Sequence, residues 1–103
     1  MTTYTKNERK VFNAIATMSA DGSVASIEDV VTETGIPAKE TRGVIGSLVK
    51  KNRVEIDEFQ NGFEPVRVDY WPVTRDGRGG FFWCDELTAE ETAAEMIRED
   101  EVK

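Results

Sequence analysis

The apolar residues change their spacing once, near Asn52, and this change limits the possible fold more than any other feature of the sequence. Before Asn52 they recur every three to four residues, as Val11, Ile15 and Met18 do, which is typical of one buried helix face. From Val54 to Tyr70 they alternate with polar residues, which is typical of strands. Helical segments followed by paired strands predict an α+β fold in which the strands form a hairpin.

Hydroxyl residues mark the starts of three expected helices. Thr5 with Glu8, and Thr88 with Glu91, match the capping box, in which the hydroxyl and the carboxylate each bind a free backbone amide. Ser26 is a cap for a second helix about two turns long. The short Ser23–Ala25 run before it fits a minimal strand.

A tight turn is expected where Gly35 follows the second helix. Glycine is favoured just after a helix, and Ile36-Pro37 then starts a third helix at a position that proline tolerates. The expected buried face of this third helix is Val44, Ile45, Leu48 and Val49. The expected outer face is Lys39, Glu40, Arg42, Gly43, Gly46, Ser47 and Lys50.

Asn61-Gly62 predicts the turn of a hairpin, with a loop longer than two residues. Val54 and Ile56 are expected on one side of the first strand, with Val66, Val68 and Tyr70 in the second. Trp71-Pro72-Val73 extends the second strand at an edge, because proline cannot donate to a central ladder. Phe81-Phe82-Trp83 is expected to pack back on the core as a further short strand.

The final helix has one small apolar face, formed by Ala89, Ala93, Met96 and Ile97. This face predicts either a dimer contact or completion of the core of one protomer. The domain organisation is therefore residues 1–86 as the main domain and residues 87–103 as a C-terminal helix and acidic tail, in the same domain or as a dimerisation element. The polar ends of the chain are expected to be disordered.

Three helices with a Gly-containing turn, followed by an alternating hairpin, resemble the winged helix-turn-helix family. The resemblance runs from Thr5 to Tyr70, and its most characteristic stretch is Thr32–Arg42. It implies a three-helix core, a β-hairpin wing and a C-terminal helix. It also implies a small transcriptional regulator that acts as a dimer and whose third helix enters the major groove of duplex DNA. The implied contacts are Lys39, Glu40, Thr41 and Arg42 near base edges, with Ser47, Lys50, Lys51 and Arg53 near phosphates.

The charges are divided unevenly along the chain, whose net charge is −7. Up to Arg53 there are eight basic and six acidic residues, and after it five basic and fourteen acidic residues. The hairpin carries Glu55, Asp57, Glu58, Glu64 and Asp69, opposed by Arg67 alone, so phosphate would repel it. The alternative function is an acidic winged-helix module that binds protein, or a nucleic-acid-mimicking inhibitor that does not bind DNA directly.

Gly43 and Gly46 on the expected outer face have two interpretations. Each weakens the helix by about 1 kcal/mol relative to alanine. They permit close approach of an external backbone, or they allow close packing inside the domain.

The sequence offers little for catalysis. It has no histidine, and Cys84 is the only cysteine, so we expect no enzyme activity, no metal site and no cofactor. No stretch is long and apolar enough to suggest a membrane segment, and a single cysteine fits a reducing compartment, so we expect a cytoplasmic protein.

Overall fold

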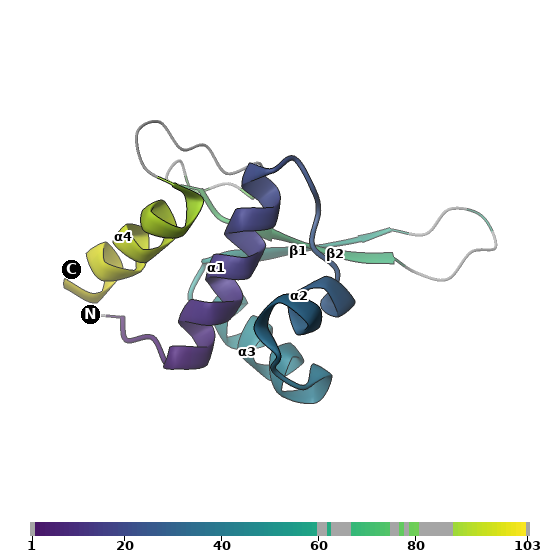
Figure 1. Ribbon diagram of the computed structural model, residues 1–103, viewed down its shortest axis with the longest axis horizontal. Helices are drawn as coiled ribbons and strands as arrows, with labels where there is room; N and C mark the ends of the chain where they lie inside the picture. Colours follow the sequence, from purple (N-terminus) through teal and green to yellow (C-terminus); the bar gives the residue numbers. More distant parts are fainter. Residues whose placement is uncertain are drawn as a thin grey trace.

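The computed structural model describes residues 2–59, 62, 67–74, 77, 79–80 and 88–102. Within these ranges the fold is α+β, with four helices and one two-stranded antiparallel hairpin, a layout consistent with a winged helix (Figure 1). The elements are α1 (Lys6–Ala20), α2 (Ile27–Thr34), α3 (Ala38–Lys50), β1 (Val54–Phe59), β2 (Arg67–Pro72) and α4 (Ala89–Val102).

The predicted helix starts are confirmed. Thr5 and Glu8 form a reciprocal capping box at α1. Thr88 and Glu91 exchange the same pair of contacts at α4. Ser26 also caps α2 as part of a capping box, whose carboxylate comes from Asp29.

The turn between α2 and α3 is formed as the sequence predicted. Gly35 has a φ of 74°, a left-handed conformation that a residue with a side chain adopts at a cost. Its amide donates to the Val31 carbonyl and ends α2, and Pro37 directly precedes α3. The turn holds the two helices against each other and leaves one face of α3 outside the core.

Helix α1 is the centre of the core. Figure 1 shows it between α4 on one side and α2 with α3 on the other. Phe12 and Ile15 of α1 are fully buried in one hydrophobic cluster that also contains Ile45 and Leu48 of α3 and Ile97 of α4. The C-terminal helix therefore shares its core with residues of the main domain.

The hairpin pairs Val54 with Pro72 and continues to Phe59 with Arg67. Pro72 ends β2, and the chain continues to Val73, which forms an isolated bridge with Gly79, while the Gly80 amide donates to the Pro72 carbonyl. The predicted extension past Pro72 is present, but the predicted edge position is corrected, because Gly79 and Gly80 lie along the outer side of the chain there. Ala25 bridges Tyr70 on the other side of β2, so the predicted minimal strand at Ser23–Ala25 is a single bridge.

Two expected core positions are corrected. Ile56 is 45% exposed although Val54, on the same side of β1, is buried, because the hairpin extends beyond the helices that cover its base (Figure 1). Val49 is 36% exposed, since Ile45 and Leu48 fill the inner face of α3. Val66, Asn61, Phe81–Trp83 and Cys84 lie outside the described residues.

The expectation for the acidic end of the chain is also corrected. We expected disorder there, but α4 continues to Val102, and its last turn lies beside the start of the described chain (Figure 1). The Thr2 amide donates to the Asp100 carbonyl, and the Tyr4 amide donates to the Glu101 carboxylate. The expectation of disorder rested on the charge of these residues alone. It was wrong because their polar groups have partners near the N-terminus.

Candidate nucleic-acid interface

The outer face of α3 carries basic side chains at its two ends. Lys39, Arg42 and Lys50 are exposed, and Glu40 is exposed beside them. Lys39, Gly43, Gly46 and Lys50 follow the spacing of one helical stripe, because they lie four, three and four residues apart. At 1.5 Å per residue, Lys39 and Lys50 are separated by roughly 16 Å along the helix axis.

The two glycines of this stripe border open space. A Cβ atom built on Gly43 or Gly46 would meet no atom within 4 Å outside its own helical surroundings. Packing inside the domain therefore does not require glycine at either position, which removes one of the two interpretations. Among the residues that the structure describes, no contact compensates for the cost that both glycines impose on α3.

A hollow of about 410 Å³ lies beside Gly43, between α3 and the start of α1. It is lined by Thr5, Asn7, Glu8, Glu40, Gly43, Val44 and Ser47. The surface of α3 is therefore recessed beside Gly43, with polar groups around the recess.

Thr41 is a correction to the expected contact set. Its side chain is fully buried, and its hydroxyl donates to the Ile36 carbonyl at 3.1 Å. This bond closes the turn before α3, so Thr41 positions the helix and does not face a ligand.

Ser47 and Lys51 are engaged inside the domain by Glu8. The Ser47 hydroxyl donates to the Glu8 carboxylate at 2.9 Å, and the Lys51 ammonium lies 2.7 Å from the same group. Lys51 also donates to the Thr3 carbonyl and lies 4.9 Å from the centre of the Tyr4 ring. These contacts correct the expectation that Ser47 and Lys51 face phosphates.

Glu8 is a buried residue, 2% exposed, and its neighbours hold its carboxylate charged. Burial by itself raises its pKa, but hydrogen bonds from Lys51, the Thr5 amide and Ser47 lower the pKa below its ordinary value. The network therefore ties the start of α1 to the end of α3.

Arg53 is also engaged within the domain, which corrects the expectation that it faces phosphate. Its Nε lies 3.3 Å from an Asp100 carboxylate oxygen, close enough for an ion pair but without the geometry of a hydrogen bond. The Tyr4 hydroxyl donates to the same carboxylate at 2.8 Å, and burial, followed by this contact, raises the pKa of Tyr4. Arg9 pairs with Glu101 at 2.5 Å. Asp100 and Glu101 thus fasten the end of α4 to the main domain.

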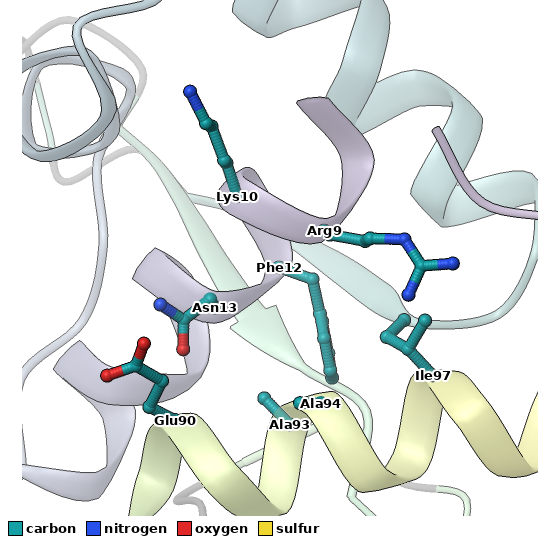
Figure 2. A pocket seen from close by; sticks show the side chains of 8 residues that line it. All are labelled: Arg9, Lys10, Phe12, Asn13, Glu90, Ala93, Ala94 and Ile97. Carbon is teal, nitrogen blue, oxygen red and sulfur yellow. The ribbon is translucent and has the colours of Figure 1, made fainter. Parts of the chain in front are cut away.

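The candidate dimer face is covered within one protomer. Ala93, Met96 and Ile97 are at most 3% exposed, and Ala89 packs against the same core. Figure 2 shows the Phe12 side chain pointing from α1 toward this helix, while Lys10 points away. The groove between α1 and α4 has a volume of about 230 Å³. The structure therefore supports the core interpretation of this face and corrects its assignment as a dimer contact.

The hairpin presents a separate, acidic surface. Glu55, Asp57 and Glu58 are exposed, whereas Asp69 is buried; Glu64 lies outside the described residues. Burial raises the pKa of Tyr70, and Arg42, Glu28 and Glu58 are the charges that act on its hydroxyl. The positive charge of Arg42 on α3 and the negative charge of Glu58 on the hairpin therefore both act on Tyr70.

Glu8, Tyr4 and Asp100 were missed as partners of the basic residues. Glu8 was interpreted only as a capping group, although it precedes Val11 and Ile15 by three and seven residues and so shares their buried face. That spacing could have identified Glu8 as a buried residue of α1. The sequence held no comparable signal for Asp100, because its partners lie far away in the chain.

The comparisons leave the family of the chain open. A scan of family models and searches of curated proteins and solved structures found no match. Among the described helices, none has the length and apolar character needed to cross a membrane. No group of three or more potential metal ligands occurs among the residues that the structure describes.

Proposed function

We propose that this protein is a small DNA-binding regulator of the winged-helix type that contacts duplex DNA with the outer face of α3. The observation that carries the proposal is the pair Gly43 and Gly46, which border open space between exposed basic residues. Two helix-weakening residues without an internal role are explained if an external backbone approaches the helix closely.

The proposed contact set is narrower than the sequence predicted. It keeps Lys39, Glu40, Arg42 and Lys50, which are exposed on α3. Lys39 and Lys50 are suited to phosphates at the two ends of the helix, whereas the planar fork of Arg42 matches the two acceptors of a guanine edge. The Glu40 carboxylate can accept from a cytosine amino group. Thr41, Ser47, Lys51 and Arg53 are left out because their polar groups bind within the domain.

The acidic hairpin does not contact phosphate in this proposal. Glu55, Asp57 and Glu58 would face the like charge of the DNA backbone, at a cost that grows as salt is lowered. In this proposal the DNA lies against α3 and away from the acidic side chains of β1.

Replacing both glycines by alanine tests the proposal. Gly43→Ala with Gly46→Ala should stabilise the domain by about 1–2 kcal/mol in urea unfolding, because alanine favours the helix and its methyl groups meet no neighbour. The same variant should bind duplex DNA more weakly than the wild type, because the methyl groups hold the DNA away from α3. Lower affinity in a more stable protein cannot come from unfolding. Unchanged or tighter DNA binding by the double variant would count against the proposal.

Arg42→Ala tests base recognition separately. It should cost about 1–3 kcal/mol of binding on the preferred sequence and relax the preference at one base pair. The measurement is a competition titration with a set of single-base-pair variants of the preferred duplex. An equal loss on every duplex would show that Arg42 contacts phosphate instead.

A further inference from the structure

The outer edge of β1 has no partner strand among the described residues where the hairpin extends beyond the helices. The Tyr70 amide donates to the Ala25 carbonyl at 2.8 Å, so Tyr70 directs its backbone groups away from β1. In an antiparallel pair, its partner Ile56 then directs its own amide and carbonyl to the opposite, outer edge. Val73 donates to the Arg53 carbonyl, which fits the same alternation. By the same register Glu58 also points its backbone groups outward, and no described strand pairs with this edge.

An exposed apolar side chain marks this edge. Ile56 is 45% exposed, whereas Val54, two residues earlier, is 2% exposed and belongs to the core. A strand added along β1 would contact Ile56 and pair the outward backbone groups of Ile56 and Glu58.

The charge of β1 determines what can lie beside it. Three of its six residues, Glu55, Asp57 and Glu58, are acidic, and none is basic. The Glu55 carboxylate accepts from the Gly79 amide at 2.6 Å, while Asp57 and Glu58 form no hydrogen bond or ion pair with another described residue. A second copy of this strand would bring carboxylates next to carboxylates, which is unfavourable for neighbouring strands. A basic segment would neutralise them.

We propose that the outer edge of β1 binds an extended, basic segment of a partner protein by strand addition, with Ile56 as its apolar contact and Asp57 and Glu58 as its charge contacts. This site is separate from the outer face of α3. It gives a function to the acidic hairpin, which takes no part in the proposed DNA contact. A protein with both surfaces can hold DNA on α3 and a basic protein segment on the hairpin.

The test uses a fluorescein-labelled eight-residue peptide of lysines with one central valine, which places lysine on both faces of the added strand, titrated into the full chain and followed by anisotropy. The control peptide has the same sequence with N-methyl groups on alternate amides, which keeps every side chain and blocks one edge of hydrogen bonds. The unmodified peptide should bind at least about tenfold more tightly, because two or more backbone hydrogen bonds are lost in the control. Equal binding of the two peptides, or no binding, would overturn strand addition.

Two variants assign the contact to this edge. Ile56→Ala should weaken peptide binding about tenfold, since most of an exposed isoleucine side chain is lost from the contact. Asp57→Asn with Glu58→Gln should weaken binding and flatten its dependence on salt.

Circular dichroism and urea unfolding check that both variants stay folded, and Arg98→Gln on α4 is the remote control. Peptide binding that is unchanged in both variants would overturn the site. The proposal would also be overturned if sedimentation showed a wild-type dimer that Ile56→Ala abolishes. In that case a second copy of the chain would occupy the edge of β1.

Discussion

The Lys51 ammonium lies 2.7 Å from the Glu8 carboxylate, while Lys50, its neighbour in the chain, is exposed to solvent. Two lysines that are adjacent in the chain therefore have different roles. Lys51 joins the end of α3 to the start of α1, and Lys50 remains available to an external partner.

This difference predicts opposite effects for the same substitution. Lys51→Gln should destabilise the domain by about 1.5–3 kcal/mol, because hydrogen bonds to a buried charged group are lost. Lys50→Gln should change stability by less than about 0.5 kcal/mol, as exposed charges usually do. Urea unfolding of the two variants measures both values. Equal stabilities would contradict the structural role of Lys51.

The low pKa of Glu8 predicts a loss of stability in acid. The unfolded chain binds a proton at Glu8 near the ordinary pKa of 4.5, but the folded chain binds it only at lower pH. The stabilisation is therefore complete above pH 4.5 and is lost as the pH falls through the folded pKa. The Arg9 hydrogen bond lowers the pKa of Glu101 and adds an effect of the same sign.

Glu8→Gln isolates this contribution. Its urea midpoint should be lower than that of the wild type at pH 7 and should change less between pH 5 and pH 3. If the variant and the wild type lose stability in parallel over that range, Glu8 is not a source of the acid sensitivity.

The packing of α4 against α1 predicts that apolar substitutions in this helix affect folding. Ile97→Ala should cost about 2–5 kcal/mol, because a fully buried side chain leaves a cavity, while Val102→Ala should be nearly silent at a position that is 74% exposed. Met96→Asp should unfold the domain, as judged by circular dichroism. A folded Met96→Asp monomer obtained from a wild-type dimer in sedimentation would restore the dimer interpretation.

The local elements were predictable because their signals lie within a few residues. Thr5 with Glu8, Gly35 and Pro37 specify helix ends through contacts that the sequence displays directly. The exposed face of α3 followed from the same spacing. Thr41 was misplaced because its hydroxyl satisfies a backbone carbonyl five residues earlier, which allows a polar side chain to be buried.

The pairing of charges was not predictable in the same way. Lys51 and Arg53 look like free basic residues in the sequence, yet their partners Glu8 and Asp100 are 43 and 47 positions away. Such pairs depend on how α1 and α4 are arranged in space. The extension of the hairpin beyond the helices, which exposes Ile56, likewise depends on tertiary structure and not on the alternation of its residues.

The most direct test of the proposed function is the salt dependence of duplex DNA binding, measured at several salt concentrations with a sequence-scrambled competitor. With Lys39, Arg42 and Lys50 as the basic contacts on α3, the logarithm of the association constant should fall with the logarithm of salt at a slope of about −2 to −3. Lys50→Gln should reduce this slope by about one unit and weaken binding to all sequences alike, whereas Arg98→Gln on α4 should leave it unchanged. Wild-type protein that shows no salt-dependent binding to duplex DNA at low salt would contradict the account and favour a protein-binding function.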